Sequence, residues 1–244
     1  MTQPDTGQPD EPATRALVVA AHPDDIDFGA AGTVAAWTAA GIEVAYCIAT
    51  RGDAGGYDDT PRELMGDLRE REQRAAAAEV GVHDVTFLDY PDGRLYVTHE
   101  LRRDITRQIR RVRPHRVIGP SPERDWRLLG RSHPDHLAVG EATVDAVYPD
   151  ARNPFAHPEL LRDEGLAAWT VGELWIAGGP DPDRYVDITD TFDRKIAALR
   201  AHASQTAHFE DLPGRLRTWL EAAARAGGLP EGHLAESFRV IDTR

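Results

Sequence analysis

The sequence is poor in the features that mark secreted, membrane and nucleic-acid-binding proteins. It holds one cysteine, Cys47, so no intrachain disulfide can form within its 244 residues. Its 28 basic residues against 41 acidic ones give a formal net charge of −13, which argues against nucleic acid or an anionic membrane surface as the main partner. The longest apolar stretches are strand-length and interrupted, so we expect no transmembrane helix and no membrane insertion.

The amino-terminal segment also lacks the marks of a targeting signal. Residues 1–14 are rich in Pro, Asp, Thr and Gln, without the basic start and apolar core of a signal peptide. We therefore expect a disordered tail over 1–14 on a cytoplasmic protein. Residues 15–244, in a chain with 41% hydrophobic residues, are expected to form a single domain.

Several catalytic and nucleotide-binding motifs are missing as well. There is no G-x-S-x-G elbow. There is no G-x-x-x-x-G-K-[ST] phosphate loop and no G-x-G-x-x-G fingerprint. The segment 29–32 falls where a nucleotide-binding loop would lie but lacks the spacing, so we interpret its small residues as allowing close packing of a helix on a sheet.

What the sequence does contain is an alternation of strand-like and helix-like segments. The expected strands and helices of the first part of the chain cover residues 15–21, 27–40, 43–50, 60–80, 85–88, 101–112, 117–118 and 134–147. The helix over 60–80 is expected to have Thr60 as its N-cap and Pro61 at its first helical position. This alternation predicts an α/β fold with a Rossmann-like, doubly wound, mostly parallel sheet.

The pattern loosens from residue 148 onward. We expect a loop over 148–168, followed by strands and helices over 174–177, 185–188, 191–203 and 216–226. We interpret this C-terminal region as a lid and substrate wall that closes over the site rather than as a separate domain.

A histidine and two aspartates follow directly after the first expected strand, in His22-Pro23-Asp24-Asp25. Ligands bind at the carboxyl ends of strands in open α/β sheets. A second group, His133-Pro134-Asp135-His136, follows the fourth expected strand, and its two imidazoles lie on one face of a first helical turn. Both groups are therefore expected at one edge of one sheet. Together they can supply imidazoles and a carboxylate to a metal ion, with a spare carboxylate as general base.

Each of these residues also has an ordinary structural explanation. An aspartate before a helix is usually an N-cap, and a lone histidine is usually a hydrogen-bonded polar residue. Two imidazoles and one carboxylate can also hold iron in an oxygenase. That site does not need the second carboxylate, Asp24, whereas metal-assisted hydrolysis does.

The two groups together resemble the zinc deacetylases of the LmbE-like, or PIG-L, family. This family includes N-acetylglucosaminyl-phosphatidylinositol de-N-acetylases and the deacetylases of mycothiol and bacillithiol synthesis. The resemblance extends to residues 50–56, 88–93 and 195–205, and so covers most of the chain between residues 15 and 205.

The resemblance implies a role for each residue of the site. His22, Asp25 and His136 would hold Zn²⁺, and other divalent metals such as Fe²⁺ fit the same ligands. The catalytic residues would be Asp24, which deprotonates the metal-bound water, and His133, which stabilises the oxyanion as a protonated imidazole. The substrate-binding residues would be Arg51, Asp53 and Asp92.

This chain departs from the family's pattern at two places. Ile26-Asp27 stands where several relatives have a glutamate after the aspartate pair. Arg131 stands where the sugar-thiol deacetylases have a tyrosine proposed as an acid. The proton for the leaving amine is therefore expected from Asp24, with His133 as the rival donor.

The expected function is a zinc-dependent hydrolase that removes an N-acyl group, as a rule acetyl, from an amino sugar or a related small molecule. The alternatives are an amidase or deacetylase that tailors a natural product, and a non-catalytic metal-binding module with the same fold. The expected partner is a small-molecule N-acyl substrate. Association into homo-oligomers is expected by analogy with the family.

Overall fold

The computed structural model of the protein describes residues 13–57 and 59–244. The predicted tail over 1–14 therefore lies outside the described residues, except for Ala13 and Thr14. No helix in the described part of the chain is long and apolar enough to cross a membrane.

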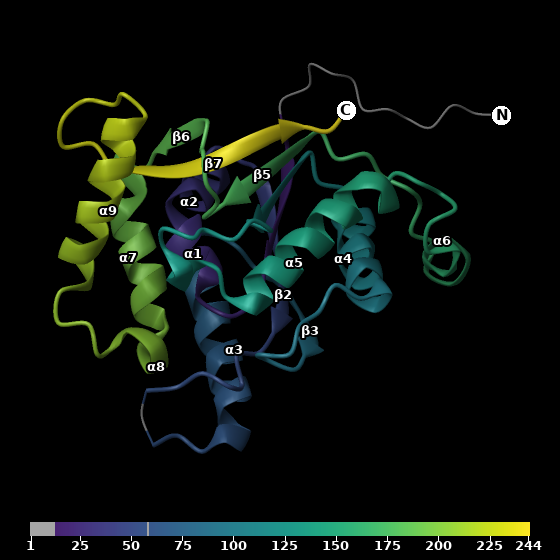
Figure 1. Ribbon diagram of the computed structural model, residues 1–244, viewed down its shortest axis with the longest axis horizontal. Coiled ribbons are helices and arrows are strands. Elements are labelled where there is room, and N and C mark those ends of the chain that lie inside the picture. Colours follow the sequence, from purple (N-terminus) through teal and green to yellow (C-terminus); the bar gives the residue numbers. More distant parts are fainter. Residues whose placement is uncertain (1–12, 58) are drawn as a thin grey trace.

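A seven-stranded, mostly parallel sheet forms the centre of the molecule (Figure 1). Its strands are β1 (Arg15–Ala20), β2 (Glu43–Thr50), β3 (Asp84–Tyr90), β4 (Arg116–Pro120), β5 (Glu173–Ala177), β6 (Arg184–Asp187) and β7 (Ala235–Asp242). They are ordered β3-β2-β1-β4-β5-β7-β6. Strands β1 to β5 pair in parallel, and β7 runs antiparallel between β5 and β6. The predicted fold class is therefore confirmed.

The strand order reverses at β1, which has β2 on one side and β4 on the other. Such a reversal opens a crevice at the carboxyl ends of the two central strands, because their connections leave toward opposite faces of the sheet. His22 follows β1, and the segment that leads to His133 follows β4. The topology thus brings the two predicted groups to the same crevice.

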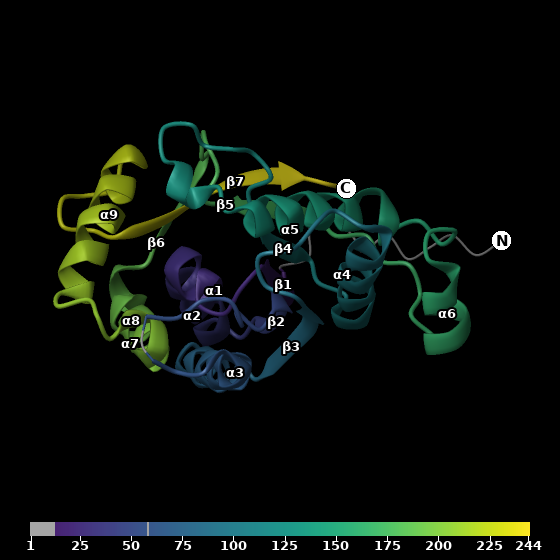
Figure 2. The same ribbon diagram turned by 60° about the horizontal axis from the view of Figure 1, so that its bottom comes forward.

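Helices cover both faces of the sheet, as Figure 2 shows. The helices are α1 (Asp25–Gly29), α2 (Ala31–Ala39), α3 (Arg62–Glu79), α4 (His99–Val112), α5 (Pro134–Asp145), α6 (Pro158–Glu164), α7 (Phe192–Ala201), α8 (Ala203–Thr206) and α9 (Leu212–Ala226). Short 3-10 turns at Leu129–Arg131 and Thr189–Thr191 and a π-helical turn at Ala146–Asp150 complete the set.

Alternate residues of β1 build the two halves of the core because successive side chains of a strand point to opposite faces. Val18 packs in a cluster with Val34 of α2 on one face. Val19 packs in a second cluster with Ile105 of α4 and Val139 of α5 on the other face. Burial on both faces explains why β1 reads as a continuous apolar run.

Several predicted helix boundaries differ from the structure, among them those of the helices next to the site. The single helix expected over 27–40 is divided into α1 and α2, which meet at Ala30 with a φ of −144°. Helix α3 begins at Arg62, and its N-cap is Pro61 rather than the predicted Thr60. Pro61 therefore precedes the helix instead of occupying its first position.

A buried ion pair stabilises the break between α1 and α2. Lys195 of α7 donates from Nζ to Oε1 of Glu236 of β7 over 2.7 Å and also to two carbonyl oxygens in the last turn of α1. The carboxylate of Glu236 accepts hydrogen bonds from two backbone N–H groups in the first turn of α2. The carbonyls belong to Asp27 and Phe28, and the N–H groups to Gly32 and Thr33. A cation thus caps a helix C-terminus while an anion caps the next N-terminus.

The C-terminal region differs most from the prediction. Strand β7 was not predicted, helices α6 and α8 lie outside the helices we expected, and α9 begins at Leu212 rather than at residue 216. Helices α7 and α9 share an apolar cluster that includes Leu199 and Leu216. Helix α7 packs against α2 and α3, and the role of this region as a lid stays a prediction.

Candidate metal centre and active site

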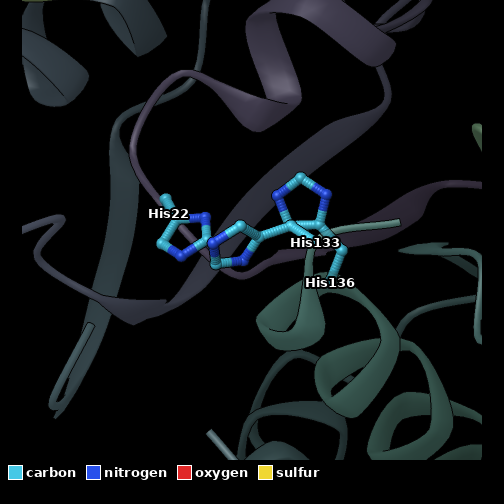
Figure 3. A group of neighbouring side chains, drawn as sticks. All are labelled: His22, His133 and His136. Carbon is cyan, nitrogen blue, oxygen red and sulfur yellow. The ribbon is translucent and has the colours of Figure 1, made fainter. Parts of the chain in front are cut away.

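Three imidazoles meet at the crevice between β1 and β4. His22 enters from the loop after β1, while His133 is the N-cap of α5 and His136 lies in its first turn (Figure 3). The ring centre of His22 lies 5.0 Å from that of His133 and 5.2 Å from that of His136. The structure therefore brings together the two groups that the sequence places more than a hundred residues apart.

The carboxylate of Asp25 lies between two of these imidazoles. Its Oδ1 is 3.0 Å from Nε2 of His136, and its Oδ2 is 3.5 Å from Nδ1 of His22. Burial opposes ionisation of Asp25, but the charge and hydrogen bond of His136, together with those of His22, hold the pKa of this carboxyl well below its usual range. Asp25 is thus an anion placed between two nitrogen donors, as a metal ligand should be.

The other nitrogen of His22 faces two further carboxylates. Nε2 lies 3.0 Å from Oδ1 of Asp92 and 3.2 Å from Oδ2 of Asp135. Burial lowers the pKa of His22, but its hydrogen bonds to the carboxylates of Asp135, Asp25 and Asp92 outweigh burial and raise the pKa to about 12. Asp135 is itself fixed, because it accepts hydrogen bonds from the backbone N–H groups of Gly93 and Leu95.

Two sets of three side chains are close enough to share one metal ion. One is His22, His133 and His136, and the other is His22, Asp92 and Asp135; in each, the candidate ligand atoms lie within 4.8 Å of one another. The second set is less suitable, since Asp135 and Asp92 already accept backbone hydrogen bonds. Those two carboxylates fit the role of orienting His22, because metal-bound imidazoles commonly donate their second N–H to a carboxylate.

The predicted set, His22, Asp25 and His136, shares two residues with the first of these sets and one with the second. In this set the two oxygens of Asp25 lie next to Nδ1 of His22 and Nε2 of His136, which leaves Nε2 of His22 for Asp92 and Asp135. Two imidazoles and one carboxylate are a common catalytic zinc set that keeps one position open for water. The residues present therefore fit a divalent metal.

Asp24 is held beside this centre by helix α3. Its Oδ2 lies 3.3 Å from Nη2 of Arg69, and its backbone N–H donates to Oε1 of Gln73 over 2.8 Å. Burial and the negative charge of Asp25 raise the pKa of Asp24 above its usual range, against the opposing charge of Arg69. A carboxylate with a raised pKa is a better proton acceptor near neutral pH.

The surroundings of His133 favour a neutral ring rather than the protonated ring that we expected. Its Nδ1 accepts a hydrogen bond from the backbone N–H of Asp135 over 3.3 Å, so its other nitrogen carries the proton of the neutral ring. Burial and the charges of His22 and His136 lower the pKa of His133. A neutral imidazole with Nε2–H can still donate a hydrogen bond to a developing oxyanion.

The three predicted substrate-binding residues are placed differently from one another. Asp92 contacts His22 directly, and Asp53 accepts a hydrogen bond from the backbone N–H of Asp92 over 3.2 Å. Arg51 pairs instead with carboxylates outside the cluster, among them Asp89 at 2.5 Å. It also lines, with Asp53, an open hollow of about 490 Å³. Substrate binding by these residues stays a prediction.

Three residues of the site were not predicted from the sequence. Asp135 lies between two histidines of the second motif, and this position is the sequence signal for its contact with His22. Arg69 and Gln73 lie in the middle of α3, in a run rich in Glu, Arg and Ala, and nothing in that run distinguishes them from surface residues. Their burial became apparent only from the packing of α3 against the His22 loop.

Comparisons with known proteins agree with this geometry. The sequence profile of the GlcNAc-PI de-N-acetylase (PIG-L) family matches residues 17–147. The diacetylchitobiose deacetylase of Thermococcus kodakarensis is 31% identical over 236 residues, which cover 96% of this chain and 85% of that protein. A probable N-acetyl-α-D-glucosaminyl L-malate deacetylase 2 of Bacillus cereus is 32% identical over 210 residues, covering 82% of this chain and 88% of that protein.

A solved structure agrees as well. The N,N′-diacetylchitobiose deacetylase from Pyrococcus horikoshii superimposes with a TM-score of 0.86 at 28% identity, covering 96% of this chain and 86% of that one. The match of the family profile to more than half of the chain, together with these relatives, shows that the protein belongs to the PIG-L (LmbE-like) family of deacetylases.

Proposed function

We propose that this protein is a zinc-dependent N-deacetylase that hydrolyses the acetamide of an amino sugar. One observation carries the proposal: the carboxylate of Asp25 lies between His22 and His136, with a second carboxylate of raised pKa, Asp24, next to it in the chain. The relatives that cover most of the chain are deacetylases of N-acetylated sugars, which supports the substrate class.

Each step of the proposed reaction can be given to a residue of the site. His22, Asp25 and His136 would hold the ion, which when bound lowers the pKa of a coordinated water to about 7. Asp24 accepts the proton of the attacking water. The Nε2–H of His133 donates a hydrogen bond to the carbonyl oxygen as that oxygen becomes negative. Asp24, now protonated, returns the proton to the nitrogen of the leaving amine.

Exposed hydrophobic side chains on three connecting segments bear on the choice of substrates. They lie on the loops after β2, β3 and β4 and comprise Tyr57, Tyr96, Val97, Trp126, Leu128 and Leu129. These loops leave the same edge of the sheet as His22 and His133. A substrate panel should therefore include acetamido sugars that carry an apolar or aromatic aglycone, which also tests the natural-product alternative.

The direct experiment measures metal content and amine release together. Protein loaded with Zn²⁺ is incubated with N-acetylglucosamine, N,N′-diacetylchitobiose and aryl glycosides of N-acetylglucosamine, and free amine and acetate are quantified. We expect equal amounts of amine and acetate, which are lost in the Asp24→Asn variant. Metal-loaded protein that releases amine from none of them would favour the non-catalytic alternative. Cytoplasmic location and homo-oligomers stay predictions, the latter tested by light scattering.

A further inference from the structure

The backbone of Asp24 has an unusual conformation for its residue type. Its φ of 83° lies in the left-handed region, which residues other than glycine adopt only where neighbouring contacts hold them. The carbonyl oxygen of Asp24 accepts the first hydrogen bonds of α1, from the N–H groups of Asp27 and Phe28. Its own N–H donates to Oε1 of Gln73.

Gln73 is fully buried, and both ends of its amide are engaged. Oε1 accepts from Asp24, and Nε2 donates to Oδ2 of Asp27 over 2.8 Å. Because a backbone N–H needs an acceptor and a carboxylate needs a donor, the amide can have only this orientation. Gln73 therefore connects the backbone of Asp24 to the side chain of Asp27.

The same oxygen of Asp27 is held from a third element. Nε2 of His202, at the junction of α7 and α8, lies 2.8 Å from Oδ2, and both residues are fully buried. The other atoms of this pair, Oδ1 of Asp27 and Nδ1 of His202, have no hydrogen-bond partner in the described part of the chain. Leaving such buried atoms unpaired costs free energy. Oδ2 of Asp27 is therefore the one oxygen through which this residue contacts both His202 and Gln73.

We infer that His202, Asp27 and Gln73 form a buried chain of positioning residues that fixes the backbone of Asp24 and so aims its carboxylate at the reacting water. The inference rests on the proposed function, in which Asp24 is the base. Arg69, one turn before Gln73 on α3, contacts the Asp24 side chain, whereas Gln73 contacts its backbone. The inference gives a role to the segment 195–205, which the sequence singled out but which supplies no group to the metal centre.

The test compares two substitutions of the same kind. In Gln73→Met, a side chain of similar volume loses both hydrogen bonds. In the control, Gln108→Met, an equally conservative change is made at a buried glutamine of α4 that bonds only to Arg111 among the described residues. We expect Gln73→Met to keep its metal and its KM while kcat falls by about 10-fold to 100-fold. Gln108→Met should change stability alone.

A conservative variant separates positioning from a charge effect. In Asp27→Asn, the amide oxygen can take the place of Oδ2 and accept hydrogen bonds from Nε2 of both Gln73 and His202, while the negative charge is lost. We expect kcat close to that of the unmodified protein. His202→Phe removes the hydrogen bond from His202 to Asp27 and should lower kcat as Gln73→Met does. It replaces Gln73→Met in the test if Gln73→Met does not fold. In the double variant Gln73→Met/His202→Phe, the fall in kcat should be smaller than the product of the two single falls, because both residues act through Asp27.

Hydrogen exchange of the Asp24 amide gives a readout that does not depend on activity. Exchange should accelerate in Gln73→Met and stay unchanged in Gln108→Met. Unchanged exchange and unchanged kcat in a folded Gln73→Met protein overturn the inference. If the unmodified protein deacetylates nothing, the proposed function fails, and hydrogen exchange alone then decides whether Gln73 holds Asp24.

Discussion

Asp24 and Asp25 are neighbours in the chain, yet their surroundings shift the pKa values of their carboxyl groups in opposite directions. Two imidazoles beside Asp25 outweigh its burial and lower its pKa. Burial and the charge of Asp25 raise the pKa of Asp24. Titratable neighbours whose environments separate their pKa values commonly divide the work of a site between them. We therefore assign Asp25 to the metal and Asp24 to the proton.

The two aspartates should respond differently to the same substitution. Asp24→Asn should leave the metal content nearly unchanged and lower kcat by about 10²-fold to 10⁴-fold, the usual contribution of a positioned general base. Asp25→Asn should lose the metal instead. Metal analysis beside initial rates measures both effects. Loss of metal from Asp24→Asn but not from Asp25→Asn would show that the roles are reversed.

His133 gives a prediction on pH dependence. Because burial and the neighbouring imidazoles lower its pKa, the ring is already neutral at pH 7 and loses no further proton as the pH rises. A bound cation would lower this pKa further. His133→Ala should therefore lower kcat by about 10²-fold to 10³-fold through the lost Nε2–H donor. The metal and the alkaline limb of the pH–rate profile should not change.

A flattened alkaline limb in His133→Ala would support the protonated ring expected from the family resemblance, and loss of metal would make His133 a ligand. The control is a rate profile of the unmodified protein on the same substrate, recorded over the same pH range.

The residues that could be predicted as site residues lie in short motifs of histidine and aspartate. His22, Asp25 and His136 could be predicted because their residue types and spacing already suit a metal. Gln73 could not, since a glutamine in a helix rich in charged residues becomes significant only when α3 packs against the His22 loop. The substrate contact expected for Arg51 stays a prediction, and its neighbours in space are carboxylates.

At the scale of elements, the division of one predicted helix into α1 and α2 depends on residues from the far end of the chain. Lys195 and Glu236 bind the carbonyl end of α1 and the N–H end of α2, and each has a side chain that is at most 1% exposed. A buried charge is tolerated only when it is paired and hydrogen-bonded. Here the free backbone groups at the break supply the additional hydrogen bonds.

Removing one charge of this pair should destabilise the fold strongly. Glu236→Gln leaves the Lys195 ammonium buried without its counter-ion, and breaking such a pair costs about 3–5 kcal/mol. The matched control is Glu164→Gln, which breaks the partly exposed pair with Arg107 and should cost about 0–1 kcal/mol. Urea unfolding of the three proteins gives both values. Equal small losses would show that the break does not depend on this pair.

The same buried pair explains why β7 could not be predicted. The strand carries Glu236 at a buried position, so its sequence lacks the clean alternation of apolar and polar residues that predicts a half-buried strand. Strands β1 and β2 were predicted because both of their faces are buried and their sequences are apolar apart from residues at their ends. Partners that lie far apart in the sequence therefore account for the missed element.

At the scale of the whole molecule, the carboxylates around His22 link the stability of the fold to pH. The carboxylates around His22 raise its pKa to about 12, although burial alone would lower it. A group with a raised pKa contributes its full stability below the pKa of the unfolded chain, about 6.5 for histidine, and loses it as the pH rises through the folded value. Because a protonated His22 is stabilised by these carboxylates at neutral pH, we expect the metal-free protein to stay folded there.

Metal removal should therefore lower stability without unfolding the protein. A metal at 100 times its dissociation constant stabilises the folded state by about 2.7 kcal/mol. Because the metal must displace a proton from His22, the rise in Tm on adding Zn²⁺ should be larger at pH 8 than at pH 6. Thermal unfolding with and without chelator measures this difference. Asp25→Asn is the control and should show no rise, whereas an equal rise in both proteins would place the metal elsewhere.

The scarcity of two residue types gives this protein built-in chemical reporters. Cys47 is its single thiol and lies buried in β2, where burial raises its pKa to about 12, and Lys195 is its single lysine, buried between α7 and β7. Thiol-directed and amine-directed reagents can reach these side chains only when the surrounding structure opens. One reports on the parallel sheet and the other on the C-terminal helices. The order in which the two side chains become labelled will show whether the C-terminal helices detach while the sheet is still closed.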